Sequence, residues 1–226
     1  MRRTMRAVAV PTMVVTALMA ASCGGGDEPS GPVTQPSSPA VTAEDCVVRL
    51  HGKSESGAPT QLDGDVARVA PNGNQRDGNG YKWIYFPDEE YAVARGIVTD
   101  AIAQFGCERI VLGGFSNGAA FAAKLYCSGD DLGATIVGVV IDDPVPDNGA
   151  AGCAPLQEAP VTLFWTGALT ATAQPGWDCD DGGWICEGGT TVGVEQFAAD
   201  LGTTITPSPF TEHIANVDAP EWTAFD

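Results

Sequence analysis

The chain has 226 residues, of which 44% are hydrophobic and 18% are charged, and its 29 acidic and 11 basic side chains give a net charge of -18. This length and apolar share indicate one folded domain with its own core and exclude a disordered or fibrous chain. Nucleic acid is excluded as a partner, because phosphate binding needs clustered lysine and arginine side chains and this chain carries the opposite charge.

The first residues predict a secretory signal peptide. Residues 1–6 carry three arginines and precede an apolar stretch, residues 7–21, that is too short to span a membrane. The end of this stretch resembles the bacterial lipobox, in which small residues precede a cysteine that receives a diacylglyceryl group. The resemblance would make Cys23 a lipidated N-terminus, although Ala20 stands where that family usually has leucine. The alternative is an ordinary signal cleaved near Ala21, with no role for Cys23.

On this interpretation residues 1–22 are the signal peptide, residues 23–44 are a flexible tether and residues 45–226 are the folded domain. The tether is predicted because a segment of Gly, Pro, Ser and Thr with almost no large apolar side chain cannot bury enough surface to fold. Removing the signal leaves 8 basic and 29 acidic residues, so the mature protein would carry a net charge of -21.

Within residues 45–226, short apolar runs alternate with amphipathic ones. The apolar runs predict strands at residues 47–50, 81–86, 109–112, 135–141, 161–165 and 203–206. Helical spacing of apolar residues predicts helices at residues 89–105, 119–126 and 194–201. Strands separated by helices predict an α/β fold, with a mostly parallel sheet of about six strands and helices on both faces. Residues 53–80, which are rich in Gly, Asn and Asp, are expected to have little regular structure and to lie over the surface.

Apart from Cys23 the chain has an even number of cysteines, as is typical of an oxidising, exported environment. They are Cys46, Cys107, Cys127, Cys153, Cys179 and Cys186. The last two close a short loop, and the first two each stand just before strands that we expect to be neighbours, which would put both thiols at the same end of the sheet. By elimination the middle two would pair with each other. No metal site is expected, because no two cysteines have Cys-x-x-Cys spacing and the chain has only two histidines.

Residues 114–118, with the sequence GFSNG, follow the strand predicted at 109–112 and open the helix predicted at 119–126. This is the G-x-S-x-G nucleophile elbow in the strand-to-helix setting that it requires, with Ser116 as the nucleophile. The flanking positions must be small because the turn is sharp and the serine is strained. The alternative is a glycine-rich turn with an idle serine.

A serine nucleophile needs a base to take its proton, and that base is usually a histidine. The two histidines are His51, directly after the first predicted strand, and His213, after the last. In the chain order Ser, acid, His, only His213 can serve Ser116. The alternative for His213 is a surface histidine near the C-terminus. For His51 we favour a structural role in bridging loops.

With these motifs the sequence resembles the α/β-hydrolases, in particular small secreted serine esterases similar to polyhydroxyalkanoate depolymerase-like esterases and cutinases. The resemblance covers nearly all of residues 45–226, from His51-Gly52 through the elbow to His213. It implies the α/β-hydrolase fold and the hydrolysis of carboxylic esters through an acyl-enzyme. It also implies an oxyanion hole formed by the backbone N–H groups of Lys53 and Asn117.

The triad acid is where the sequence departs from the commoner pattern of these hydrolases. In that pattern the acid stands three residues beyond a glycine after the penultimate strand, which is Thr170 here, and a threonine cannot stabilise an imidazolium. The preceding strand ends in Asp142-Asp143-Pro144, which resembles lipases and related hydrolases that carry the acid one strand earlier. We therefore predict Asp143, with Asp142 second and Asp178 third. The alternative is that both Asp142 and Asp143 only terminate the strand.

The sequence as a whole predicts an exported serine hydrolase, either anchored by lipid at the outer face of a bacterial membrane or secreted. We expect a monomer that needs no cofactor and acts on a small-molecule or polymeric ester, and the negative charge favours neutral substrates over anionic ones. Two alternatives stay open. The same elbow serves peptidases and acyltransferases, and the threonine at position 170 favours a non-catalytic surface-binding lipoprotein with a hydrolase scaffold.

Overall fold

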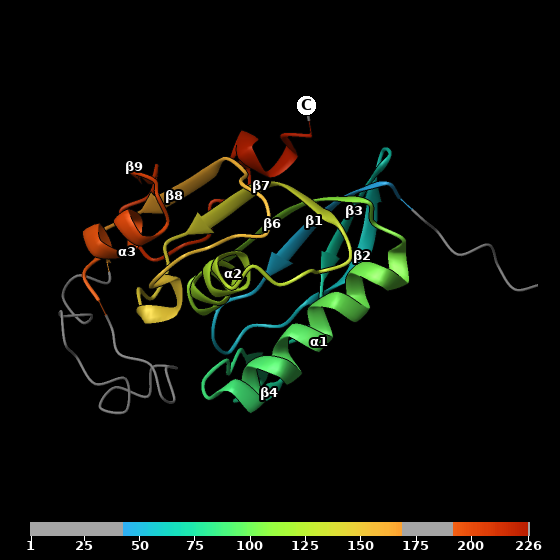
Figure 1. Cartoon of the computed structure of the whole chain (residues 1–226), viewed down its shortest axis with the longest axis horizontal. Coiled ribbons are helices and arrows are strands. Elements are labelled where there is room, and N and C mark those ends of the chain that lie inside the picture. The colour runs from blue at the N-terminus through green and yellow to red at the C-terminus, as the bar shows by residue number, and fades with distance from the viewer. Residues whose placement is uncertain (1–42, 169–191, 226) are drawn as a thin grey trace, which may run out of the picture. The chain divides into compact units, whose positions relative to one another are not determined.

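The computed structural model of the chain describes residues 43–168 and 192–225 (Figure 1). The strands of its main sheet are β1 (Asp45–Leu50), β2 (Ala58–Asp63), β3 (Val66–Ala70), β6 (Arg109–Phe115), β7 (Thr135–Asp142), β8 (Val161–Trp165) and β9 (Ile205–Pro207). They lie in the order β2-β3-β1-β6-β7-β8-β9. All neighbours are parallel except β2 and β3, which are antiparallel. This topology confirms the predicted fold class, a mostly parallel sheet of the α/β-hydrolase kind.

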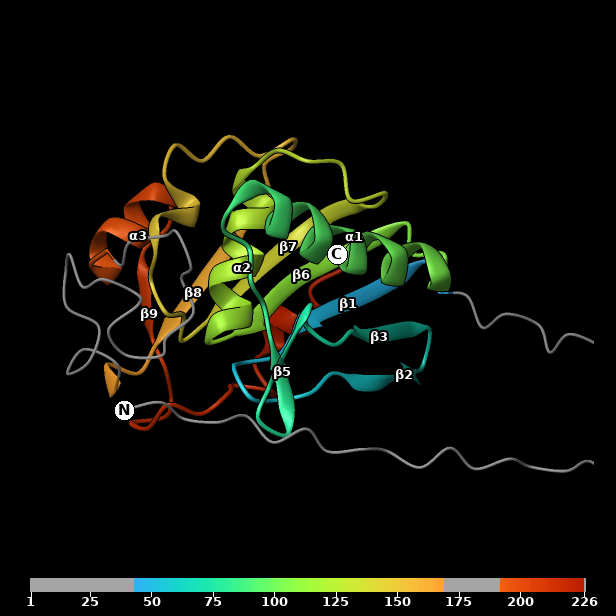
Figure 2. The same ribbon diagram turned by 90° about the horizontal axis from the view of Figure 1, so that it is seen from below.

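Alternate residues of the central strands divide between the two faces of the sheet, as the strand period requires. On one face Val48, Leu50 and Ile110 belong to a core that also contains residues of α1 (Asp88–Phe105), α2 (Asn117–Cys127) and α3 (Val194–Asp200). Figure 2 shows these three α-helices on the same side of the sheet. On the other face a smaller core joins Val47 to Trp222 of the 3-10 helix η4 (Pro220–Thr223). Within the described residues, both faces are therefore covered, but very unequally.

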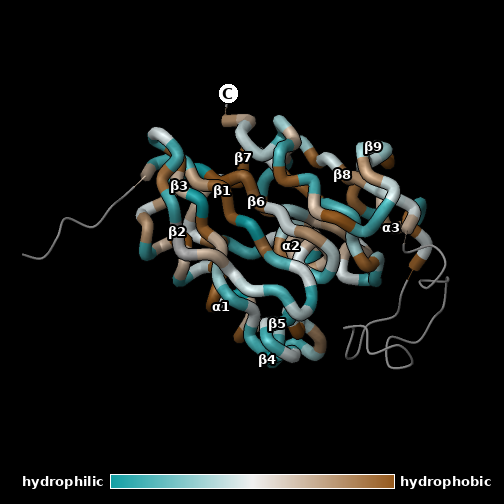
Figure 3. Tube along the Cα trace, turned by 180° about the vertical axis from the view of Figure 1, so that it is seen from behind, coloured by the Kyte–Doolittle hydropathy of each residue, from teal (hydrophilic) through white to brown (hydrophobic). Residues whose placement is uncertain are grey.

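The central strands are the most apolar part of the chain trace, as the brown segments of Figure 3 show along β1, β6 and β7. Helix α1 begins after Pro87 with three acidic residues in its first turn, where negative charge is favourable, and ends at Gly106. Gly106 adopts a left-handed φ of 65°, the usual conformation of a glycine that ends a helix. Both ends agree with the sequence prediction.

The prediction of irregular structure for residues 53–80 is wrong. Two strands of this segment, β2 and β3, form one edge of the main sheet, and β4 (Gln75–Asp77) pairs with β5 (Gly80–Lys82) in a separate hairpin. The sequence signal is weak because the buried positions of β3 are Ala67 and Val69, one of them a small residue, with the charged Arg68 between them.

The strand predicted at residues 81–86 is also too long, because β5 ends at Lys82. The following Trp83 and Ile84 are buried, but their backbone groups bond to side-chain amides instead of a neighbouring strand. Asn117 accepts the N–H of Trp83 (2.7 Å) and donates to its carbonyl (3.1 Å), and Asn74 does the same for Ile84 (2.9 Å each). A short apolar run alone cannot distinguish such a buried loop from a strand.

Two of the predicted disulfides, Cys46–Cys107 and Cys127–Cys153, are present. They indicate that the domain folds in an oxidising, exported environment. The third predicted pair, Cys179 with Cys186, lies outside the described residues, as do Cys23, the signal peptide and most of the tether. No helix within residues 43–168 and 192–225 has the length and hydropathy needed to cross a membrane.

Candidate active site

Ser116 lies in the turn between β6 and α2, with a backbone conformation of φ 55° and ψ -118° that L-residues rarely adopt. The turn is crowded. A Cβ at Gly114 would lie 2.5 Å from the backbone of Gly118, and a Cβ at Gly118 would lie 2.3 Å from the carbonyl oxygen of Leu50. Because only glycine fits at both flanking positions, the G-x-S-x-G pattern of this chain has a steric cause.

His213 lies in the loop after β9, and its ring reaches Ser116. The Nε2 atom is 2.8 Å from Ser116 Oγ, and the Nδ1 atom is 2.6 Å from Asp143 Oδ2. The ring also packs against Phe115, with 4.5 Å between the ring centroids. The three side chains predicted from the sequence therefore lie in one hydrogen-bonded chain, although 97 positions separate the serine from the histidine.

The carboxylate of Asp143 is fully buried and accepts three hydrogen bonds. Besides the ring of His213, Thr166 donates its backbone N–H to Oδ1 (3.0 Å) and its hydroxyl to Oδ2 (2.7 Å). These bonds offset the cost of burying a charged group. Thr166 was not among the predicted site residues. In the sequence, only its position directly after β8 could have indicated this role. Strand β8 lies beside β7, and β7 ends directly before Asp143.

Asp142 was the second candidate for the triad acid, and the structure directs its side chain elsewhere. Its Oδ2 accepts the backbone N–H of Asn216 at 2.6 Å, and its Oδ1 is buried with no hydrogen-bond partner among the described residues. The pKa of Asp142 is raised to about 6, mainly by burial and also by the neighbouring charge of Asp143, although the bond from Asn216 acts in the opposite direction. Asp178, the third candidate, lies outside the described residues.

The position that favoured a non-catalytic scaffold, Thr170, also lies outside the described residues. Position 170 is not needed to supply the acid in this chain, because Asp143 brings a carboxylate to His213 from the preceding strand. The threonine at position 170 is therefore no argument for a non-catalytic protein.

The two residues predicted to form the oxyanion hole flank Ser116. Asn117 is the first residue of α2, where N–H groups have no acceptor within the helix. Lys53 follows Gly52, and a Cβ at Gly52 would lie 3.3 Å from the Cβ of Ser116, so this turn passes directly against the serine. The N–H of Gly52 donates to Glu55 Oε2 at 2.8 Å, which holds the turn in place.

His51 is buried, and both of its ring nitrogens are bonded to backbone. Its Nε2 accepts the N–H of Gly73 at 2.9 Å, so the ring proton must be on Nδ1, which is 2.7 Å from the carbonyl oxygen of Gly52. Burial lowers the pKa of His51 and favours this neutral form. His51 thus joins two loops, in agreement with the structural role that we favoured.

Within the part of the chain that the structure describes, no three side chains of His, Cys, Asp or Glu are grouped so that they could hold a metal ion. The site brings together a serine hydroxyl, an imidazole and a carboxylate. Such a set can transfer acyl groups.

No protein-family model matches the sequence. A search of curated proteins also found no match. Among solved structures, the chain is similar to one described as the esterase PE8, with 22% identity, a TM-score of 0.46 and coverage of 78% of this chain and 88% of that one. It is also similar to a carboxylesterase of Bacillus cereus, with 14% identity, a TM-score of 0.48 and coverage of 77% and 82%. Both TM-scores lie below 0.5, so a functional assignment depends on the geometry of Ser116, His213 and Asp143.

Proposed function

We propose that this protein is an exported serine hydrolase that cleaves carboxylic esters. One observation carries the proposal: Ser116, His213 and Asp143 form a continuous chain, with 2.8 Å from Oγ to Nε2 and 2.6 Å from Nδ1 to Oδ2. These are the distances at which a histidine can take the proton of a serine nucleophile while a carboxylate holds the ring.

In the resting enzyme the imidazole of His213 carries its proton on Nδ1, which donates a hydrogen bond to Asp143, and Nε2 is therefore able to accept the proton of Ser116. The Oγ atom of Ser116 bonds to the ester carbonyl carbon while its proton moves to Nε2. The tetrahedral intermediate collapses, the bond to the alcohol oxygen breaks, and that oxygen takes the proton from Nε2. A water molecule, deprotonated by the same nitrogen, then attacks the acyl-enzyme, and the carboxylic acid leaves as Ser116 regains its proton.

The negative charge that develops on the carbonyl oxygen needs hydrogen-bond donors next to Ser116. We assign this role to the backbone N–H groups of Asn117 and Lys53, which come from the two chain segments that flank the serine. One such donor is worth about 2.7–4 kcal/mol in the transition state.

The surroundings of His213 favour a neutral ester with an apolar acyl group. Phe210 and Ile214, in the loop that carries the histidine, are 38% and 46% exposed. Exposed apolar side chains grouped on one loop are typical of a binding surface. The net charge of -18 disfavours anionic substrates on encounter. We retain the lipid anchor at Cys23 as part of the proposal, on the lipobox-like residues that precede it.

Turnover of p-nitrophenyl esters with acyl chains of two to twelve carbons, measured on the full-length chain, tests the proposal. We expect Ser116→Ala to lower kcat/KM by at least about 10³-fold. Ser128→Ala is the matched control, because Ser128 is exposed at the opposite end of α2 from Ser116, and it should leave turnover unchanged. Folded wild-type protein that cleaves none of these esters would contradict the proposal. Faster cleavage of an anilide than of the ester with the same acyl group would point to a peptidase, and transfer to an added alcohol to an acyltransferase.

A further inference from the structure

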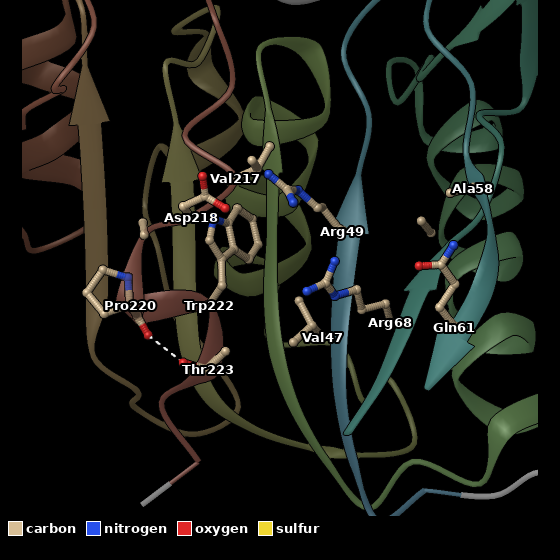
Figure 4. Close-up of a pocket in the computed structure, with 12 residues that line it drawn as sticks. Val47, Arg49, Ala58, Gln61, Arg68, Val217, Asp218, Pro220, Trp222 and Thr223 are labelled. Carbon is tan, nitrogen blue, oxygen red and sulfur yellow. Dashed lines mark hydrogen bonds between the residues drawn. The ribbon is translucent and has the colours of Figure 1, made fainter. Parts of the chain in front are cut away.

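The sheet face opposite the three α-helices carries a pocket of about 360 Å³ (Figure 4). Its floor consists of side chains from β1, β2 and β3, and one wall is the C-terminal segment 217–223. The pocket exists because η4 covers only the middle of this face. Trp222 lies over β6, where a Cβ at Gly113 would come within 2.8 Å of its ring, and the strands beyond are left open. The volume falls in the range of small-molecule sites.

Two guanidinium groups lie on this floor, in a chain that has few cations. Arg68 is the cross-strand partner of Val47, and Arg49 follows two positions later on β1, so both arginines project from the same face as diagonal neighbours. Figure 4 shows both side chains extending toward the wall formed by Trp222. Burial lowers the pKa of Arg49, and the charge of Arg68 lowers it further, whereas Asp142, Asp218 and Glu55 raise it. The two guanidinium groups repel each other, and an anion bound between them would relieve that repulsion.

The guanidinium of Arg49 is only partly satisfied by the protein. It stacks on the ring of Trp222 at 4.7 Å, but its Nη2 is buried and has no hydrogen-bond partner among the described residues. Arg68 does have a partner, since its Nη2 pairs with Asp63 at 3.0 Å. Both members of that pair are more than half exposed, and such pairs add little stability, so Arg68 can exchange Asp63 for a ligand.

The other residues that line the pocket indicate which charge and shape a bound ligand would have. Asp218 lines the pocket, Asp63 pairs with Arg68, and Asp142 acts on the charge of Arg49, so carboxylates already lie close to both guanidinium groups. A ligand with one negative charge therefore suits this pocket better than a dianion. Val217, Ala219, Pro220 and the ring of Trp222 add apolar surface beside the charges. A carboxylate matches the planar fork of an arginine, and a short apolar body matches this wall.

We propose that this pocket binds a small monocarboxylate with an apolar body, held by Arg49 and Arg68 and packed against Trp222. The site is independent of the proposed ester hydrolysis, because none of its lining residues belongs to the Ser116, His213 and Asp143 chain. The loop that carries His213 does continue directly into its wall, since Trp222 Nε1 donates to the carbonyl of Asn216 at 2.8 Å.

Isothermal titration of sodium hexanoate into the full-length Ser116→Ala protein tests the site without turnover. We expect saturable binding that weakens at least about tenfold in Arg68→Gln and in Arg49→Gln. Arg76→Gln is the matched control, because Arg76 is an exposed arginine of β4 that stacks on Tyr81, and it should bind as the parent does. Arg68 is itself more than half exposed, so its substitution tests the proposal even where Arg49→Gln fails to fold.

Two further ligands distinguish the contribution of the charge to the affinity from that of the apolar body. Hexanamide has the shape of hexanoate without the charge, and inorganic phosphate has the charge without the body. Both should bind at least about tenfold more weakly than hexanoate. The proposal is overturned if hexanoate does not bind, if the two arginine variants bind it as well as Arg76→Gln does, or if hexanamide or phosphate binds as tightly as hexanoate.

Discussion

Asp142 and Asp143 are consecutive residues, yet their carboxylates hold the same loop at two points. Asp143 Oδ2 is 2.6 Å from the ring of His213, and Asp142 Oδ2 accepts the backbone N–H of Asn216, also at 2.6 Å. Asp143 has a positive φ of 45°, an uncommon conformation for a non-glycine residue at the point where the two side chains part. Trp222 bonds to the carbonyl of Asn216 and fixes the loop from its other side.

Substituting each aspartate separately distinguishes their roles. Asp143→Ala should lower kcat/KM by about 10³-fold or more, because His213 loses the group that orients it and stabilises its charged form. Asp142→Asn should lower it by less than about tenfold, since an amide oxygen can still accept the N–H of Asn216. Ester turnover and thermal unfolding are measured on both variants. A loss below about tenfold in a folded Asp143→Ala protein would mean that Asp143 is not the acid.

Thr166 should act on the reaction through Asp143. Thr166→Val keeps the shape of the side chain and removes the hydroxyl that donates to Asp143 Oδ2. We expect kcat to fall about tenfold with little change in KM, which corresponds to one hydrogen bond to a charged group, worth about 1.5 kcal/mol. Thr135→Val, at an exposed position at the start of β7, is the matched control. Equal activity of the two variants would show that this hydrogen bond does not matter for the reaction.

Asp142 should make the domain less stable as the pH rises. Its pKa is about 6 in the folded protein against an ordinary value of 3.8, so between these values the folded state holds more protons than the unfolded chain. The free energy of unfolding therefore falls as the pH rises from about 4 to about 6, and it stays lower above that range. Between pH 5 and pH 8 the wild type should lose about 1 kcal/mol more than Asp142→Asn. Urea unfolding at both pH values measures this, and an identical loss in the two proteins would contradict it.

The two disulfides should contribute unequally to stability. Cys46–Cys107 closes a loop of 61 residues and Cys127–Cys153 one of 26, and a longer loop removes more entropy from the unfolded chain. Replacing the first pair by alanine should cost about 4 kcal/mol, and replacing the second about 3.5 kcal/mol. Urea unfolding of the two double variants compares them, and a larger cost for the second pair would contradict the loop argument.

Sequence reasoning predicted the Ser116, His213 and Asp143 set because each member has a local signal. The two glycines around Ser116 have a steric cause, and His213 is the one histidine that follows Ser116 in the sequence. Asp143 stands in an Asp-Pro step at the end of a predicted strand. The central strands and the helices were predicted for a similar reason, since their apolar residues recur with a clear period.

Residues that act through neighbours in space had no such signal. Thr166 matters because β8 lies beside β7, and Asn117 clamps Trp83 across 34 positions of sequence. Strand β3 was missed because only Ala67 and Val69 are buried in it, on either side of the exposed Arg68. That Arg49 and Arg68 lie next to each other follows from the register of β1 and β3, and it could not be predicted without that register.

The central claim is that Ser116 is a nucleophile activated by His213. Labelling of the full-length protein with a fluorophosphonate, followed by mapping of the modified peptide, tests it most directly. We predict that the label is on Ser116, that Ser116→Ala does not react, and that His213→Ala reacts at least about 100-fold more slowly. Folded wild-type protein that takes up no label at Ser116, or that labels equally fast without His213, would contradict the claim.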